Sequence, residues 1–194
     1  MTSELEIAAN AVATVSIVLA GRNSVHTWWT GIIGCLLFGV LFYQSQLYAD
    51  VALQGFFVLT SGFGWWQWLR GAQGQPLAVS NAGLGLLMRC VLGGMAATLT
   101  YGAMLHAWTD AYAPFVDSAV LVFSVIAQLL LMQRKIETWA FWLLVNTIAV
   151  PLYASRGLQL TAILYAAYWV NALVSWWWWH RRAQAGPSTG ATPL

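Results

Sequence analysis

The chain has 194 residues, of which 60% are hydrophobic and only 7% carry a charge, with a formal net charge of +2. A water-soluble domain carries roughly 25% charged residues, so this composition excludes a soluble fold and indicates an integral membrane protein. The charges lie mainly between the apolar runs, which indicates membrane topology rather than nucleic-acid binding.

Seven apolar runs are long enough to cross the hydrocarbon, for which about 20 residues are needed. We therefore predict an all-α protein with transmembrane helices near 4–21, 27–44, 48–69, 84–107, 115–133, 137–154 and 158–180. The connections are short, so no loop can hold a soluble domain, and function must reside in the helix bundle. The sequence after Arg182, AQAGPSTGATPL, is typical of a disordered tail.

Basic residues gather on one side of the predicted membrane. That side holds Arg22, Arg70, Arg89, Arg134, Lys135, Arg181 and Arg182. The opposite side holds Arg156 together with Asp110. Because Lys and Arg are enriched in cytoplasmic loops, we expect the N-terminus outside the cell and the C-terminus in the cytoplasm.

The sequence repeats itself at an offset of 111 residues, where 25–71 lies over 136–182 without a gap. Matches include Thr27/Thr138, Trp28/Trp139, Leu41/Leu152, Leu53/Leu164, Trp65/Trp176, Trp66/Trp177, Trp68/Trp179 and Arg70/Arg181. Two adjacent three-helix units would have opposite orientations, and the additional helix between them restores the direction. We therefore predict parallel repeats in a 3+1+3 arrangement. The predicted divisions are a first repeat 1–71, a linker helix 72–114, a second repeat 115–182 and a tail 183–194.

Polar and aromatic side chains recur at helical spacing in the second half. On the helix near 137–154, Trp139, Trp142 and Asn146 lie three and four residues apart and so share one stripe. An unsatisfied amide in hydrocarbon is costly, so this stripe should face a cavity, a partner helix or a ligand. We interpret it as part of a substrate site. The other candidate members are Asp117, Ser124, Gln128, Tyr165, Tyr168, Asn171 and, in the first half, Gln54.

Two segments carry a family resemblance. They are GIIGCLLFGVLFYQSQLYADVALQGFFVLTSGFGWWQW and DSAVLVFSVIAQLLLMQRKIETWAFWLLVNTIAVPLYASRGLQLTAILY. With the 3+1+3 layout, they resemble the PnuC family of bacterial vitamin transporters. The resemblance implies a SWEET-like fold, a homotrimer in the bacterial cytoplasmic membrane, and facilitated uptake of nicotinamide riboside that supports NAD biosynthesis. It also implies trapping of the substrate by a cytoplasmic kinase, and it leaves thiamine or riboflavin open as the substrate.

The chemistry of the candidate residues fits such a ligand. A flat, cationic pyridinium ring is attracted to Trp and Tyr faces. Amide side chains such as those of Gln128, Asn146 and Asn171 offer both donors and acceptors to hydroxyl and carboxamide groups. The same amides also suit hydrogen bonds between helices, and Asp117 suits a helix end equally well.

Tryptophans near the ends of the predicted transmembrane helices have a second interpretation. Beside arginine, they can form an aromatic belt at the membrane–water interface. This interpretation applies to Trp28, Trp65, Trp66, Trp68 and Trp176–Trp179, and equally to Trp139.

Several kinds of site are missing from the sequence. We find no HExxH motif, no nucleophile with a base, no phosphate-cradling loop and no metal-ligand spacing, so we expect neither an enzyme nor a bound cofactor or metal. No acidic residue falls in the middle of a predicted span, so we expect passive alternating access rather than transport coupled to protons or sodium. The identity of the residues that form the gates is left open by the sequence.

Overall fold

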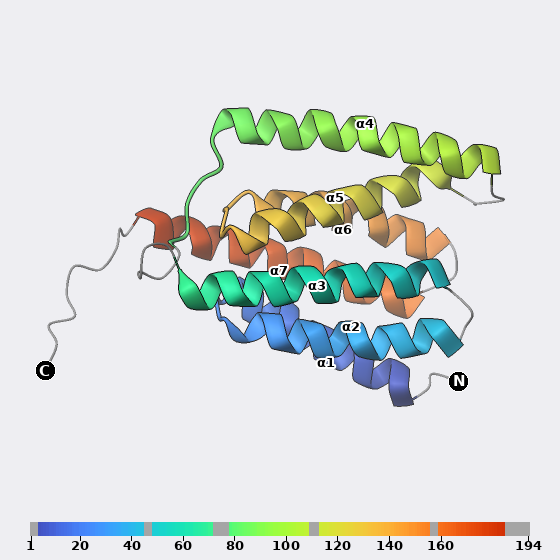
Figure 1. Ribbon diagram of the computed structural model, residues 1–194, viewed down its shortest axis with the longest axis horizontal. Coiled ribbons are helices and arrows are strands. Elements are labelled where there is room, and N and C mark those ends of the chain that lie inside the picture. The colour runs from blue at the N-terminus through green and yellow to red at the C-terminus, as the bar shows by residue number, and fades with distance from the viewer. Residues whose placement is uncertain (1–3, 45–47, 72–77, 109–112, 156–158, 185–194) are drawn as a thin grey trace, which may run out of the picture. The chain divides into compact units, whose positions relative to one another are not determined.

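The computed structural model describes residues 4–44, 48–71, 78–108, 113–155 and 159–184. The described residues form seven helices (Figure 1), in agreement with the seven predicted spans. They are α1 (Glu4–Gly21), α2 (His26–Gln44), α3 (Tyr48–Arg70), α4 (Leu84–Trp108), α5 (Pro114–Met132), α6 (Thr138–Ser155) and α7 (Gln159–Gln184). Helix α7 continues beyond the predicted end at His180, and the tail from residue 185 on lies outside the described residues.

The helices follow from apolar composition together with the requirement that backbone N–H and C=O groups be paired inside a membrane. In the described part of the chain, α1, α4 and α5 are long and apolar enough to span a bilayer. Helices α2 and α6 contain shorter apolar stretches, His26–Leu41 and Thr138–Leu152. Pro114 occupies the first turn of α5, where its missing N–H leaves no helical hydrogen bond unmade.

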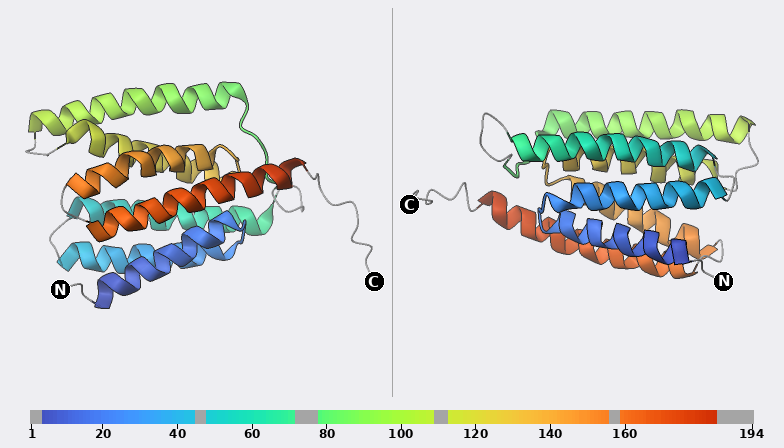
Figure 2. Two further views of the ribbon diagram at one scale, coloured as in Figure 1. Left: turned by 180° about the vertical axis from the view of Figure 1, so that it is seen from behind. Right: turned by 60° about the horizontal axis from the view of Figure 1, so that its bottom comes forward.

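The chain divides into two compact units, Met1–Ala78 and Val79–Leu194. In the first unit α1 packs on α2 and α2 on α3; in the second, α4 packs on α5, α5 on α6 and α6 on α7. Figure 2 shows these neighbours from two further directions. The helix between the two predicted repeats, α4, therefore packs with the second unit.

The turn after α1 and the turn after α5 have the same geometry. Asn23 and Arg134, which are equivalent at the offset of 111, both adopt a left-handed conformation, with φ of 57° and 51°. In each turn the next residue donates a backbone hydrogen bond across the helix end: Ser24 N to Leu19 O at 3.0 Å, and Lys135 N to Leu130 O at 2.9 Å. This pattern is a Schellman motif, which ends a helix by satisfying its last carbonyl groups.

Buried tryptophan pairs close the corresponding end of each unit. Trp28 meets Trp68 edge to face at 5.2 Å between ring centroids, and Trp139 meets Trp179 in the same manner at 5.5 Å. All four side chains are at most 4% exposed. The belt interpretation is therefore wrong for Trp28, Trp68, Trp139 and Trp179, because these rings pack inside their unit.

Three tryptophans near the ends of α3 and α7, namely Trp66, Trp177 and Trp178, are exposed and lie beside arginine. Guanidinium groups lie over their rings: Arg70 over Trp66, Arg181 over Trp177 and Arg182 over Trp178. A cation over an indole face suits the membrane–water interface, where the ring is apolar and the charge remains hydrated.

Apolar side chains of α4, α5 and α6 form the core of the second unit. The buried members are Phe123, Ala127, Leu130, Phe141 and Val145, with Leu86, Leu87 and Cys90 of α4 packed against them. Gly94 allows α4 to approach closely, since a Cβ atom there would lie 2.7 Å from the Phe123 ring. Helix α4 is thus fitted to α5 through a small residue, as is common in membrane bundles.

A strap of chain before α4 is bonded to the turn between α5 and α6. Ser80 N donates to Arg134 O at 3.1 Å, and Ile136 N donates to Ser80 O at 3.0 Å. Lys135 Nζ donates to Ser80 Oγ at 2.9 Å, and Ala82 N donates to the Glu137 carboxylate at 2.7 Å. Glu137 therefore lies at the N-terminal ends of both α4 and α6, where a negative charge is favourable.

Candidate functional site

Helix α5 contributes three of the predicted site residues, which share one face. Ser124 and Gln128 are one turn apart, and Asp117 lies two turns before Ser124, in the first turn of the helix. All three side chains are half-buried. The neighbouring face of α5 carries Phe123 and Ala127, which pack into the apolar core, so the polar face borders the core without forming part of it.

Helix α6 contributes the Trp139, Trp142 and Asn146 stripe. Asn146 is 3% exposed, which makes it the most buried amide among the predicted residues. Trp142 is half-buried and packs against the apolar cluster around Phe123 and Phe141. Trp139 is buried, and its indole Nε1 has no hydrogen-bond acceptor among the described residues. A buried donor left unpaired is costly, so this N–H suits a ligand or water.

Helix α7 contributes Tyr165, Tyr168 and Asn171, all half-buried. The rings of Tyr165 and Tyr168 lie 5.7 Å apart between centroids, tilted by 54°. Because α6 packs on both α5 and α7, nine of the ten predicted residues come from three consecutive, contacting helices of one unit. Two tyrosine rings beside neutral amides can contact a flat ring and its hydroxyl groups.

A contact between α6 and α7 involves residues that the sequence prediction missed. Trp169 Nε1 donates a hydrogen bond to Thr147 Oγ1 at 3.0 Å. Thr147 directly follows Asn146, and Trp169 lies one turn after Tyr165. The signal in the sequence was a threonine and a tryptophan beside predicted site residues, but their pairing required knowing how the two helices pack.

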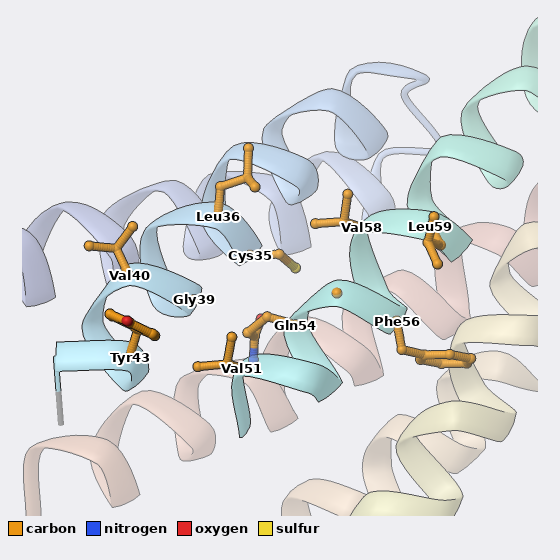
Figure 3. Close-up of a pocket in the computed structure, with 11 residues that line it drawn as sticks. Cys35, Leu36, Gly39, Val40, Tyr43, Val51, Gln54, Phe56, Val58 and Leu59 are labelled. Carbon is orange, nitrogen blue, oxygen red and sulfur yellow. The ribbon is translucent and has the colours of Figure 1, made fainter. Parts of the chain in front are cut away.

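Gln54, the tenth predicted residue, belongs to the first unit and lines a groove between α2 and α3. The groove has a volume of about 900 Å³. Its lining includes Cys35, Leu36 and Gly39 from α2 and Gln54 and Val58 from α3, which Figure 3 shows as sticks. Most of the lining is apolar, and the Cβ of Gln54 lies 3.9 Å from the position that a Cβ would occupy at Gly39.

Some of the groove residues have equivalents with hydrogen-bonding groups in the second unit at the offset of 111. Cys35 corresponds to Asn146, and Gln54 corresponds to Tyr165. The same location in the second unit therefore carries more hydrogen-bonding groups, whereas Tyr43 and Phe56 of the groove correspond to Ala154 and Ala167.

Charged groups near the predicted residues are few. In the described residues no cluster of three His, Cys, Asp or Glu side chains is arranged to hold a metal ion. Burial lowers the pKa of Arg134, in the turn between α5 and α6, to about 10, and the positive charge of Arg182 adds to this effect. Arg134 remains protonated at neutral pH, so the α5–α6 turn keeps its positive charge.

Comparisons with known proteins place the chain in a family. Residues 3–181 match the family described as nicotinamide mononucleotide transporter. The nicotinamide riboside transporter PnuC of Escherichia coli K12 is 28% identical over 191 residues, covering 84% of this chain and 79% of the relative. The riboflavin/roseoflavin transporter RibM of Streptomyces davaonensis is 24% identical, covering 88% of this chain and 81% of the relative.

A solved structure shows the same fold. The crystal structure of the vitamin B3 transporter PnuC matches with a TM-score of 0.72 at 21% identity, covering 92% of this chain and 83% of that one. The family and these relatives are transporters rather than enzymes, in accord with the apolar helices. The chain therefore belongs to the nicotinamide mononucleotide transporter family, as a multi-pass membrane protein.

Proposed function

We propose that this protein carries nicotinamide riboside across the bacterial cytoplasmic membrane by facilitated diffusion. The observation that carries the proposal is the set of neutral polar and aromatic side chains on α5, α6 and α7, among which Asn146 is the most buried amide. Relatives in Escherichia coli and Neisseria mucosa, named nicotinamide riboside transporters, support this substrate.

The proposed contacts divide by chemistry. Tyr165, Tyr168 and Trp142 offer aromatic faces to the pyridinium ring, an attraction of about 1–2 kcal/mol per ring when water is excluded. Asn146 and Gln128 hydrogen-bond the carboxamide or ribose hydroxyl groups without fixing a charge. The remaining proposed contacts are Ser124, Trp139, Asn171, Asp117 and Gln54.

Alternating access is the proposed mechanism of movement, and the repeated architecture supports it. Equivalent turns at Asn23 and Arg134, and equivalent pairs Trp28–Trp68 and Trp139–Trp179, are what two repeats of one three-helix unit would share. We propose that these repeats are parallel and that one rocks against the other. A cytoplasmic kinase then phosphorylates the vitamin and prevents its return.

Orientation and assembly are part of the same proposal. Arg134 and Lys135 after α5, and Arg181 and Arg182 near the end of α7, favour a cytoplasmic location for these turns and for the C-terminus. The N-terminus then lies outside. The family resemblance supports a homotrimer embedded in membrane lipid.

Riboflavin is the alternative substrate with a specific observation in its favour, the similarity to RibM. Riboflavin also presents a flat ring and several hydroxyl groups, so the same kinds of side chain would bind it. Thiamine, left open by the family resemblance, requires the same test.

Calorimetric titration of the purified protein with nicotinamide riboside, riboflavin and thiamine tests the proposal. We expect nicotinamide riboside alone to bind tightly, and tight binding of another vitamin instead would overturn the assignment. Asn146→Leu and Gln128→Leu should each abolish binding, because each removes an amide but remains compatible with the bilayer. Normal binding by both variants would remove these residues from the site.

Transport itself is measured in vesicles containing the protein. Labelled nicotinamide riboside should reach equal concentrations inside and outside. An imposed proton or sodium gradient should not change that end point, since no acidic residue lies in the middle of a predicted span. Because nicotinamide riboside carries a positive charge, the vesicles are held at zero membrane potential, and accumulation driven by either gradient would then contradict facilitated diffusion.

A further inference from the structure

The hydrogen bond between Trp169 and Thr147 joins α7 to α6. The indole Nε1 donates to Thr147 Oγ1 at 3.0 Å, and that hydroxyl donates its own proton to Leu143 O at 2.7 Å. The second bond orients the hydroxyl so that a lone pair faces the indole. The geometry of the contact is therefore fixed from both sides.

This contact lies beside the proposed substrate residues on both helices. Thr147 directly follows Asn146 on α6. On α7, Trp169 lies one turn after Tyr165 and directly follows Tyr168. A contact at this level fixes how α7 is placed along and around α6. It thereby fixes where the two tyrosines lie relative to the asparagine.

The first unit provides an internal comparison, because it has equivalent helices without the bond. The equivalents of Thr147 and Trp169 are Leu36 and Val58, neither of which has a polar side-chain atom. Both residues line the groove of about 900 Å³ between α2 and α3. In place of the polar contact between α6 and α7, the first unit therefore has two apolar side chains that line a groove, although α2 and α3 also pack on each other.

We infer that Trp169 and Thr147 are positioning residues, which hold α6 and α7 at the separation that the substrate requires. This inference rests on the proposed function, since it concerns the same site. Neither residue needs to touch the ligand. A contact that sets the spacing before binding reduces the ordering cost of binding and so increases affinity.

Thr147→Val tests the bond directly, because valine has nearly the same shape and removes only the hydroxyl. We expect nicotinamide riboside to bind about threefold to tenfold more weakly, in line with the loss of one interhelical hydrogen bond. Thr147→Ser keeps the acceptor and should bind within about twofold of the unchanged protein.

Thr100→Val is the matched control. Thr100 is also exposed and also donates to a carbonyl one turn earlier, Ala96 O at 2.9 Å, but it lies on α4. Unchanged affinity in this control, with weaker binding in Thr147→Val, supports the inference. Affinity that is unchanged in Thr147→Val, or equally weakened in both variants, overturns it.

A double-mutant cycle separates positioning from direct contact. If the two residues act only through their bond, Trp169→Phe and the double variant with Thr147→Val should bind as weakly as Thr147→Val alone. If the losses multiply, Trp169 contacts the substrate itself and the inference is wrong.

In vesicles, a positioning role raises the KM for uptake but leaves the maximal rate per folded protein unchanged, and a fall in that rate alone contradicts the inference.

The unchanged protein is titrated first, so that failure of the two ideas can be distinguished. If it binds no nicotinamide riboside, the proposed function fails, and the cycle is repeated with whichever vitamin binds. If it binds and Thr147→Val binds equally well, only the positioning role fails.

Discussion

The side-chain hydroxyl of Thr138 donates a hydrogen bond to the main-chain carbonyl of Ala127, with 2.7 Å between the two oxygens. Thr27 makes the equivalent bond to Ser16 O at 2.8 Å. Both threonines are buried, at 0% and 5% exposed. Each bond joins the start of one helix to the preceding helix, so it holds together the two helices on either side of a Schellman turn.

Thr138→Val should destabilise the protein by about 1 kcal/mol, because a buried hydrogen bond is lost without a change in shape. For a protein of this size, that corresponds to a fall of about 2–4 °C in the melting temperature, measured in detergent by loss of the folded peak. Thr138→Ser should retain most of the stability. Equal melting temperatures for the valine and serine variants would show that the hydroxyl contributes nothing.

Gly64→Ala should destabilise the first unit through overpacking. A Cβ atom at Gly64 would lie 2.6 Å from the Trp28 ring, which is itself wedged against Trp68. Forcing a methyl group into such a contact typically costs about 1–3 kcal/mol. Gly62→Ala is the control two residues away, where a Cβ would meet nothing within 4 Å. Melting temperatures of the two variants should therefore differ, and the same fall in both would point to helix propensity alone.

Glu137→Gln should loosen the strap before α4. The carboxylate accepts a hydrogen bond from Ala82 N at 2.7 Å and lies at two helix N-termini, so loss of its charge should cost about 0.5–1.5 kcal/mol. Hydrogen exchange at residues 80–82 should accelerate, and the melting temperature should fall. Glu4→Gln, at an exposed position in the first turn of α1, also removes a charge from a helix N-terminus but should leave exchange at residues 80–82 unchanged. Unaltered exchange in the Glu137 variant would show that the strap does not depend on the charge.

Trp142→Ala should weaken nicotinamide riboside binding more than Trp178→Ala. Trp142 is half-buried beside Asn146, whereas Trp178 is 42% exposed under Arg182. Loss of one stacking ring should reduce affinity by about tenfold, and loss of an interfacial anchor should leave it nearly unchanged. Trp142→Phe keeps a ring and controls for the cavity that alanine creates. The reverse ranking in a titration would assign Trp142 to the core around Phe123.

The seven helices were predictable because each lies on a mainly apolar run, and charged residues lie near the ends of most of them. The matching turns at Asn23 and Arg134 agree with the ungapped match of tryptophans and arginines in the sequence, and the division into two parallel repeats stays a prediction. The burial of Trp28 and Trp179 was not predictable. In a membrane both the lipid and the protein core are apolar, so the sequence pattern does not show which side of a helix faces the lipid and which faces the core. A tryptophan beside an arginine therefore suits the interface and the interior equally well.

The sequence was sufficient to assign the candidate side chains to three helices. That these side chains bind a substrate stays a prediction. The Thr147–Trp169 bond depends on how far α7 is shifted along α6, which no local pattern encodes. The strap has the same limitation, since Ser80 and Lys135 are 55 residues apart in the chain. Nothing in the sequence around either residue indicates its partner.

The matching turns at Asn23 and Arg134 have a consequence for engineering. Because the backbone bonds of residues 19–28 recur in residues 130–139, either segment can close the helix end that the other closes. A chimaera carrying the first turn in place of the second would keep the backbone path while exchanging Arg134 and Lys135 for Asn23 and Ser24. Such grafts would separate two roles that the natural chain combines in one loop: reversing the direction of the chain and supplying positive charge.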